Sequence, residues 1–536
     1  MVSLLCVAIV CICFVIRATP RFVIRHTLAA DTCFHLYCAE LYRSNRFRIP
    51  KTITRLVMPN ENTYPPLYHL LLGLFPVRLR SYAERFSGAA FDTLSLVVVY
   101  AYTRALQDAG VVNDSQHIPL LVVTFFCFSP ALLRIGIGPR AFDGSPRVLG
   151  QLLYLIHICS FHVWTHTGSV WLVCLSVGAG ALLILTAKFA NQVFVFFGIC
   201  FTVIYPPYAG VAGAACLLST AVSMGHAARV IRGQFRHSLF YVRYLQKVFL
   251  HPQSRTFGRY MYDAAAHCYL LLTGGRVWNA VKWYFTERNT LHVAITAQPF
   301  LLAACWYIYT NGGSPFMTTW IGSALVAFLI TSCRWLAFLG EPERYLEFAT
   351  APTVIMSAVL FTGLPTWSLL VVLCYCVTST VCSVLNYVID HLLAERQHNQ
   401  VVAACDMLNN LPQGIVLPIG SIKWAVLLKT RHHVLAPGCN LDERVQSVEQ
   451  FMQVAGRYPY PGPQIEPLLQ KHCVQYIVTT RRELTHYLNR ICEDCSRFEE
   501  LTTVVNECDA FLVLIVKRAL LSSKLTCTPV ALPAAK

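Results

Sequence analysis

Besides Tyr64-Pro-Pro-Leu-Tyr-His69, which a plain helix entry explains well, three clusters of polar residues that could do chemistry stand in an otherwise apolar chain. The first is Asp31-Thr-Cys-Phe-His35. Asp31 and His35 are four residues apart, so on a helix they share one face. A carboxylate at such a position can accept a proton from a hydroxyl group, and Glu40 follows in the same stretch as a supporting acid. The alternative is that Asp31 only caps the amino end of a helix.

The second cluster is Arg140-Ala-Phe-Asp143-Gly-Ser-Pro-Arg147, which places two guanidinium groups and one carboxylate in a short turn. Arginine binds phosphate through two parallel hydrogen bonds, so Arg140 and Arg147 are candidate phosphate ligands. Asp143 is a second candidate for the catalytic machinery. A solvated Asp-Gly turn, flanked by arginines whose charged ends reach water, explains the pattern equally well.

The third cluster is the segment GEPERYLEF at 340–348, in which three acids and one arginine lie between two apolar stretches. Charges at the edge of a membrane are costly unless they are paired or functional, and this density favours function. Arg344 and Tyr345 are candidate ligands for a phosphate. The acids that would orient the arginine are Glu341, Glu343 and Glu347.

The composition indicates a membrane protein. Only 13% of the 536 residues are charged, whereas soluble domains carry about 25%, which excludes an ordinary soluble enzyme, a coiled coil and a disordered chain. The sequence also lacks a P-loop, a Gly-x-Gly-x-x-Gly loop, an HExxH helix and a Gly-x-Ser-x-Gly elbow. Phosphoryl transfer from soluble nucleotides and zinc proteolysis are therefore not predicted, and no feature indicates a nucleic-acid partner.

A membrane span needs about 20 apolar residues, and about eleven segments are candidates. We read the Pro-rich segment 64–77 as a re-entrant or interfacial element, because it is too short to span. The candidate spans are 2–16, 87–106, 118–135, 147–164, 169–186, 189–206, 207–225, 293–311, 315–335, 351–365 and 368–389.

With eleven spans the two termini lie on opposite sides of the membrane, and the alternation of the spans places the larger loops on one face. These are the first loop 17–86, the second loop 136–146 and the long loop 226–292, and they share that face with the C-terminal part. We expect this face to be extracytoplasmic. The positive-inside rule argues the other way, because arginines such as Arg229 and Arg236 lie in the long loop; the rule weakens for loops longer than about 60 residues.

Residues 391–536 have a different composition, with 15 basic and 13 acidic residues, against 28 basic and 14 acidic residues in 1–390. Short apolar runs alternate with turns and helical stretches, which is typical of a small α/β domain with a buried sheet. The predicted runs are 414–420, 424–428, 474–480 and 511–516. We therefore expect a mainly α, polytopic transmembrane module over 1–390, followed by a soluble α/β domain over 391–536.

With these clusters and this topology, the chain resembles the GT-C superfamily of multipass membrane glycosyltransferases, including the protein O-mannosyltransferases and the aminoarabinose transferase. The resemblance covers most of 1–390. It rests on an acid in the first loop (Asp31, with His35), an acid in the second (Asp143), and the stretches NTYPPLYHLLL, SPRVLGQLLYL and GEPERYLEF, which look like those of an uncharacterised bacterial and archaeal branch.

The resemblance implies an inverting transfer of a sugar from a polyprenyl-phosphate-linked donor to an acceptor hydroxyl. Asp31 would be the general base, with His35 and Asp143 orienting it or the acceptor. The donor phosphate would be held by Arg140, Arg147, Arg344 and Tyr345, with Glu40 and the three acids of 340–348 in support. Membrane lipids and an acceptor glycan, lipid or protein are the implied partners.

The chain departs from the family at three points. It has no Asp-x-Asp in the first loop, no adjacent Asp-Glu pair there and no WWDYG signature in the C-terminal part. No metal ligand is therefore assigned, although the resemblance leaves a divalent metal open as a cofactor. Two other functions stay open: a transporter or flippase of lipid-linked sugars, favoured by Asp92 within an apolar stretch, and a GT-C-like scaffold without activity.

Overall fold

The computed structural model describes residues 2–24, 30–133, 142, 144–245, 257–273, 277–287, 289–445, 447–457, 460–508 and 511–517. The chain forms two compact units. The first comprises residues 1–25, 65–232 and 251–391, and the second comprises 26–64, 233–250 and 392–536. The second unit thus includes part of the first loop and a short piece of the long loop.

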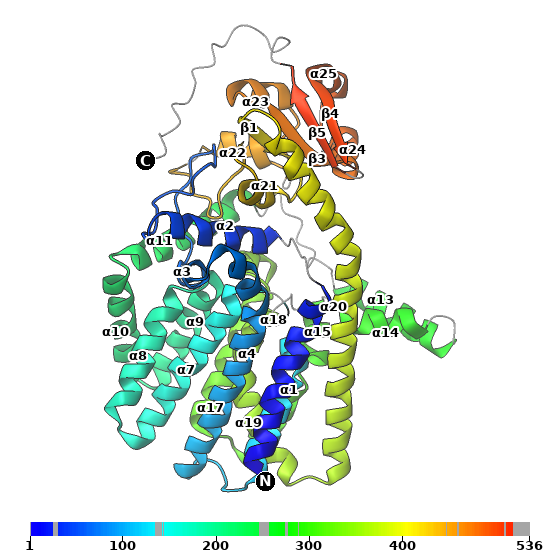
Figure 1. Ribbon diagram of the computed structural model, residues 1–536. Helices are drawn as coiled ribbons and strands as arrows, with labels where there is room; N and C mark the ends of the chain where they lie inside the picture. The colour runs from blue at the N-terminus through cyan, green and yellow to red at the C-terminus, as the bar shows by residue number, and fades with distance from the viewer. Residues whose placement is uncertain are drawn as a thin grey trace. The chain divides into compact units, whose positions relative to one another are not determined.

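The first unit is a bundle of apolar helices (Figure 1). Its main helices are α1 (Val2–Val23), α3 (Leu67–Leu74), α4 (Val77–Asp108), α5 (His117–Cys127), α6 (Pro130–Leu133), α7 (Pro146–Thr167), α8 (Val170–Ile184), α9 (Lys188–Ile204), α10 (Pro207–Val222), α15 (Thr290–Thr296), α16 (Pro299–Asn311), α17 (Pro315–Thr331), α18 (Glu343–Glu347) and α19 (Thr350–Thr362). A hairpin of α13 (Phe257–Leu272) and α14 (Val277–Thr286) belongs to the same unit, and α11 (His226–Phe240) and α20 (Thr366–Asn409) continue from it into the second.

Each predicted span coincides with a helix or a helix pair, but the count of eleven is not confirmed. Among the described residues, four helices are long and apolar enough to cross a membrane, and up to six spans result if each bent helix pair counts as one. Five further apolar helices are shorter. At 1.5 Å per residue, a helix of 13–17 residues reaches only about 20–26 Å, less than the ~30 Å hydrocarbon core.

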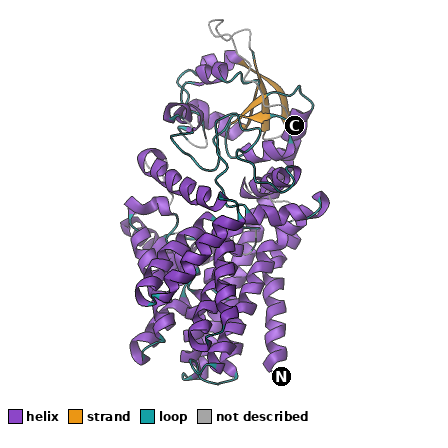
Figure 2. Cartoon of the chain, turned by 90° about the vertical axis from the view of Figure 1, so that its left-hand side faces the viewer, coloured by secondary structure: helices purple, strands orange, loops and turns teal. Residues whose placement is uncertain are grey.

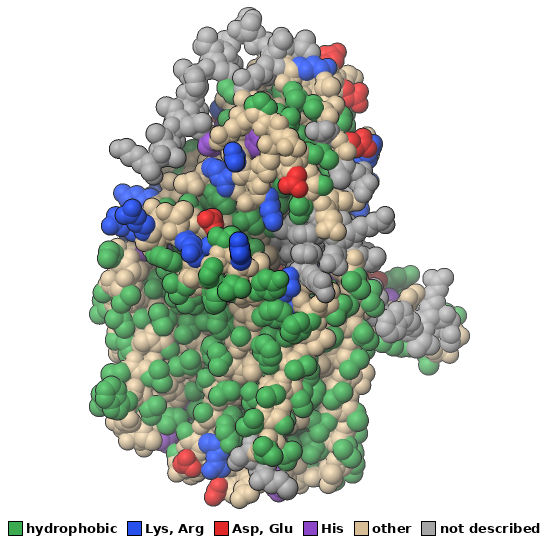
Figure 3. All heavy atoms as spheres, viewed as in Figure 1, with side chains coloured by type: hydrophobic (Ala, Val, Ile, Leu, Met, Phe, Trp, Pro, Cys, Tyr) green, Lys and Arg blue, Asp and Glu red, His purple; other side chains and the backbone are tan. Residues whose placement is uncertain are grey.

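The outer surface of these helices is apolar. Large side chains such as Trp171, Val203, Leu217 and Trp367 are exposed, and hydrophobic side chains cover much of the visible helical surface (Figure 3). Exposing such a surface to water would cost free energy, whereas contact with lipid chains would not. The first unit is accordingly an integral membrane module.

The second unit contains one five-stranded sheet of order β2-β1-β3-β5-β4 (Figure 2). The strands are β1 (Ile415–Pro418), β2 (His433–Val434), β3 (Tyr476–Thr480), β4 (Thr502–Cys508) and β5 (Phe511–Val516). β1 is parallel to β2 and β3, and β5 is antiparallel to β3 and β4. The predicted runs 414–420, 474–480 and 511–516 contain strands, but 424–428 lies in helix α21 (Lys423–Lys429).

Both faces of the sheet are covered, as its alternating side chains show. Val416, Val478 and Val513 belong to one core cluster, whereas Leu417, Ile477 and Leu514 belong to another. The first cluster packs against α21 and α2 (Ala30–Ser44); the second packs against α22 (Val448–Ala455), α23 (Ile465–Lys471), α24 (Arg481–Arg490) and α25 (Cys495–Leu501).

The first-loop segment is built into this unit through its backbone. Leu56 bridges Val434 in β2 in parallel. The amide of Val57 donates to the carbonyl oxygen of Val434 over 2.9 Å, and the amide of Val434 donates to that of Arg55 over 2.8 Å. The segment 26–64, which includes Asp31, is therefore part of the second unit and is anchored to its sheet through residues 55–57.

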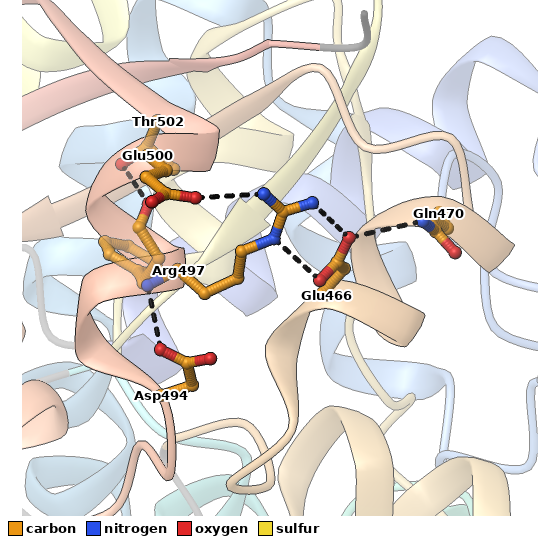
Figure 4. A network of polar contacts seen from close by, with 7 residues as sticks. Glu466, Gln470, Asp494, Arg497, Glu500 and Thr502 are labelled. Carbon is orange, nitrogen blue, oxygen red and sulfur yellow. Dashed lines mark hydrogen bonds and ion pairs between the residues drawn. The ribbon is translucent and has the colours of Figure 1, made fainter. Parts of the chain in front are cut away.

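A polar network ties α23 to α25 (Figure 4). The guanidinium of Arg497 donates to the Glu466 carboxylate through Nε at 3.0 Å and Nη2 at 2.9 Å, and to Glu500 through Nη1 at 3.0 Å. The Asp494 carboxylate caps α25 by accepting from the Arg497 amide at 2.9 Å. A bidentate pair of this kind fixes the angle between the two helices.

Candidate active site

Asp31 lies in the first turn of α2, and its side chain is exposed. One turn further along, His35 is buried beside Phe34 and Tyr64, with ring centroids 5.4 and 6.5 Å away. Burial lowers the pKa of His35 to about 4, although the nearby Asp31 carboxylate acts in the opposite direction. The imidazole is therefore neutral at pH 7 and can exchange a hydrogen bond without adding charge.

Asp31 lines a cavity of about 90 Å³ in the second unit. The other walls come from the residues that follow β1 and β2. They are Pro418, Gly420, Ser421, Lys423, Trp424, Leu435, Ala436 and Pro437, together with Val454 and Ala455 of α22. The cavity thus brings the predicted base together with residues about 400 positions away.

The turn after β1 needs a glycine. Gly420 has a φ of +100°, and a Cβ there would lie 2.2 Å from Oε2 of Glu483. Glu483 is itself fixed at the start of α24, where its amide donates to the Thr480 hydroxyl over 3.0 Å. A larger residue at 420 would therefore move the chain that forms the cavity wall.

Lys423 is the basic residue of the cavity. Its Nζ donates to the carbonyl oxygen of Pro437 over 3.0 Å and lies 5.0 Å from the ring centroid of Trp424. Burial lowers the pKa of Lys423. Neither Lys423 nor Trp424 was predicted from the sequence. The available signal was the Gly-Ser pair at 420–421 directly after an apolar run, because ligands of α/β sheets bind at the carboxyl ends of strands.

In the first unit, the predicted phosphate ligand Arg147 lies at the start of α7. Its amide donates to the side chain of Ser145, the N-cap, over 3.2 Å. Its Nε is 3.9 Å from the carboxylate of Glu347, which is fully buried. Gln151, one turn along, donates to the backbone carbonyl of Glu347 over 2.9 Å. These contacts fix Arg147 against α18.

The acids of α18 differ in environment. Glu341, just before the helix, forms an ion pair of 2.6 Å with Arg344, and both side chains are about 30% exposed. Glu343 is buried, and burial, reinforced by the nearby Glu341 and Glu347 charges and opposed by Arg344, raises its pKa to about 7. Near neutral pH, Glu343 therefore exchanges a proton.

Tyr345, also predicted as a phosphate ligand, lies in the core of the first unit. Its hydroxyl donates to the carbonyl oxygen of Leu339 over 3.2 Å, and its ring packs 4.7 Å from that of Phe189. The side chain is fully buried. The phenolic proton is thus used within the core, and the role of Tyr345 at a phosphate site remains a prediction.

Two buried ion pairs in the first unit were not predicted. The Arg17 guanidinium pairs with Asp92, and both side chains are completely buried. Arg17 also donates to the carbonyl oxygens of Cys127 over 3.0 Å and Phe126 over 3.4 Å, which ties α1 to α4 and α5. Arg21 and Glu84 lie 3.8 Å apart nearby along the same helices.

The predicted site residues thus divide between the two units. Asp31, His35 and the exposed Glu40 are in the second unit. Arg147, Glu341, Glu343, Arg344, Tyr345 and Glu347 are in the first. Arg140 and Asp143 lie outside the described residues, so their predicted roles remain predictions.

A metal site is not evident in the part of the chain that the structure describes. No group of three or more His, Cys, Asp or Glu side chains there is arranged to hold a metal ion. His35, the nearest imidazole to Asp31 in the sequence, is buried among aromatic rings. We therefore assign no residue and no step to a metal.

Comparison with solved structures identifies the fold. ArnT from Cupriavidus metallidurans bound to undecaprenyl phosphate is 12% identical, with a TM-score of 0.56, over 95% of this chain and 97% of ArnT. The Archaeoglobus fulgidus oligosaccharyltransferase, in complex with Zn and sulfate, is 12% identical, with a TM-score of 0.53, over 92% of this chain and 71% of that one. No protein-family model and no curated protein sequence matches the chain.

These similarities show that the chain has the GT-C fold, as the sequence predicts. The same archaeal protein, tethered to an acceptor peptide containing the NVT sequon, also matches with a TM-score of 0.53 at 12% identity, over 93% of this chain and 72% of that one. Because the sequence identity is only 12%, this structural similarity shows the fold and not the reaction.

Proposed function

We propose that the protein is a membrane glycosyltransferase that moves a sugar from a polyprenyl-phosphate-linked donor to an acceptor hydroxyl, with inversion at the sugar carbon. The observation that carries the proposal is the position of the Asp31 side chain. Its exposed carboxylate lines a cavity and lies one helical turn from the buried imidazole of His35. A solvent-reachable carboxylate in a cavity of a GT-C fold is the expected form of a general base.

In the proposed reaction, the acceptor oxygen attacks the anomeric carbon from the side opposite the phosphate. The new carbon–oxygen bond forms as the bond between that carbon and the phosphate oxygen breaks, and Asp31 takes the hydroxyl proton. The bond electrons leave with the polyprenyl phosphate, which needs no proton if cationic groups stabilise its charge. Attack from the opposite side inverts the configuration.

For the donor phosphate, we assign Arg147 and Arg344, together with Arg140 as predicted from the sequence. Arg147 is held by Glu347 at 3.9 Å and Arg344 by Glu341 at 2.6 Å. An acid that fixes a guanidinium in one orientation lowers the entropic cost of binding the phosphate. His35 and Asp143 would orient Asp31 or the acceptor, and Glu40 would support them.

The transporter hypothesis loses its main support. It depended on Asp92 as an isolated carboxylate within a span, and Asp92 is paired with Arg17 and completely buried. This pair has a structural role, because Arg17 joins α1 to α4 through Asp92 and to α5 through two carbonyl oxygens. The residues left for chemistry lie at the ends of helices and in the second unit.

We further propose that the second unit lies on the extracytoplasmic face, as polyprenyl-linked donors of the GT-C type require. The basic residues of the long loop oppose this orientation under the positive-inside rule. Two of them are partly neutralised, since Arg236 pairs with Asp442 at 2.9 Å and Arg243 with Glu443 at 2.6 Å.

An assay for free polyprenyl phosphate tests the proposed function. The full chain in detergent is incubated with an undecaprenyl-phosphate-linked sugar and a lipid and glycan extract as the source of acceptors. A glycosyltransferase releases undecaprenyl phosphate in proportion to the sugar transferred. A transporter or an inactive scaffold leaves the donor intact, and that result would reject the proposal.

A further inference from the structure

The cavity beside Asp31 lies at the carboxyl ends of two adjacent parallel strands. β1 ends at Pro418 and β2 at Val434. The residues that follow each strand form its walls: Gly420 and Ser421 after β1, and Leu435, Ala436 and Pro437 after β2. Ligands of open α/β sheets bind outside the carboxyl ends of the strands, so the position itself indicates a binding site.

The polar side chains that line the cavity suit a ligand with several hydroxyl groups. Asp31 offers a carboxylate, Lys423 an ammonium group, and Ser421 a hydroxyl that can donate and accept. Lys423 is oriented by the Pro437 carbonyl oxygen at 3.0 Å. A sugar hydroxyl can accept from the ammonium group and donate to the carboxylate at the same time.

The remaining walls are apolar and the space is small. Trp424, Leu435, Ala436 and Val454 line the cavity and are themselves buried; such walls suit the C–H face of a sugar ring. The volume is about 90 Å³, and one water molecule needs about 10–15 Å³ of such space. The cavity therefore accommodates one ring or side chain and not an extended oligomer.

We infer that this cavity is the acceptor subsite, and that the group entering it is a single sugar ring whose reacting hydroxyl lies beside Asp31. The inference rests on the proposed function and names the class of acceptor, a saccharide. A peptide fits less well, because sheets recognise extended peptides along an open strand edge, whereas this cavity lies at strand ends. Ser421 and Lys423 are then specificity residues for the acceptor.

Ligand binding to the full chain in detergent tests the inference, with methyl α-D-mannopyranoside and methyl β-D-glucopyranoside as probes and saturation-transfer NMR as the measurement. We expect a signal from at least one glycoside with the wild type. Ser421→Trp adds bulk at an exposed position on the cavity and should reduce the signal at least tenfold. Ser496→Trp, exposed on α25 in the same unit, should leave it unchanged.

Equal binding by wild type and Ser421→Trp would overturn the inference, as would binding of a Ser/Thr peptide in place of both glycosides. Release of undecaprenyl phosphate from the donor, measured on the same wild-type sample, separates this inference from the proposed function. Donor cleavage without Ser421-dependent glycoside binding contradicts the acceptor subsite alone. Ser421-dependent binding without donor cleavage contradicts the proposed function and leaves a saccharide site.

Discussion

The ring of Phe34 lies 4.7 Å from that of Trp424, and this contact joins the helix that carries Asp31 to the helix that follows β1. Both side chains belong to the same core cluster, and both are buried. The position of Asp31 at the cavity is therefore set by the packing of two segments that are almost 400 residues apart in the sequence.

Phe34→Ala should destabilise the second unit and reduce activity together. Replacing a well-packed phenylalanine by alanine costs about 3–5 kcal/mol, so we expect a lower Tm of the full chain in detergent and weaker sugar transfer. Phe47→Ala is the matched control, because Phe47 is 42% exposed. An unchanged Tm in Phe34→Ala would show that α2 is not held by this contact.

Asp92→Leu should destabilise the first unit strongly. It leaves the Arg17 guanidinium buried without its carboxylate, and breaking a buried ion pair in this way costs about 3–5 kcal/mol. The double variant Arg17→Met with Asp92→Leu should recover most of the lost Tm, since no charge is then buried. If the double variant has a lower Tm than either single variant, the ion pair stabilises the fold by more than the cancellation of two buried charges.

Stability should fall as the pH rises because of Glu343. Its pKa is about 7 in the fold, against an ordinary 4.5, so the folded state binds more protons than the unfolded state between these values. The free energy of unfolding begins to fall above pH 4.5 and stops falling just above pH 7. The total decrease is roughly 3 kcal/mol.

Tm measurements at pH 5 and pH 8.5 check this dependence, and Glu343→Gln should flatten it by removing the ionisable group. Glu499→Gln, which changes an exposed acid of the second unit, should keep the wild-type slope. The same slope in Glu343→Gln as in the wild type would assign the pH dependence to another group.

Arg147→Met should weaken the binding of undecaprenyl phosphate. A charge-assisted contact to phosphate contributes about 1.5–3 kcal/mol, so we expect a Kd about 10 to 100 times higher. Titration of the lipid against the Tm of the full chain measures it. Arg78→Met, at an exposed position near the start of α4, is the control. Equal affinities for the two variants would remove Arg147 from the phosphate site.

Much of the fold follows from apolar patterning. Every predicted span is helical, and three of the four apolar runs of the C-terminal part contain strands, because burial fixes such segments locally. The run 424–428 is a helix, since a short apolar run is compatible with either structure until its neighbours are known. The number of membrane spans could not be predicted from this pattern, because it depends on the lengths of the helices and on the bends between them.

The residues of the candidate site could be predicted only in part. Asp31 and Arg147 stand out because charges are rare in apolar sequence. Lys423, Ser421 and Trp424 do not stand out, because only the docking of α2 and residues 55–57 onto the sheet brings them to Asp31. The Arg17–Asp92 ion pair could not be predicted from the sequence for the same reason. Its two residues are 75 positions apart, and their pairing depends on the packing of α1 against α4.

The most direct test of the central claim is the rate at which Asp31→Asn releases undecaprenyl phosphate from the lipid-linked sugar. Asparagine keeps the size of the side chain but cannot take the proton, and general-base catalysis contributes about 10²–10⁴-fold. We predict a rate lower by that factor, with an unchanged Tm and unchanged undecaprenyl phosphate binding, while Glu499→Gln keeps the wild-type rate. A wild-type rate in Asp31→Asn would contradict the assignment of Asp31 as the base.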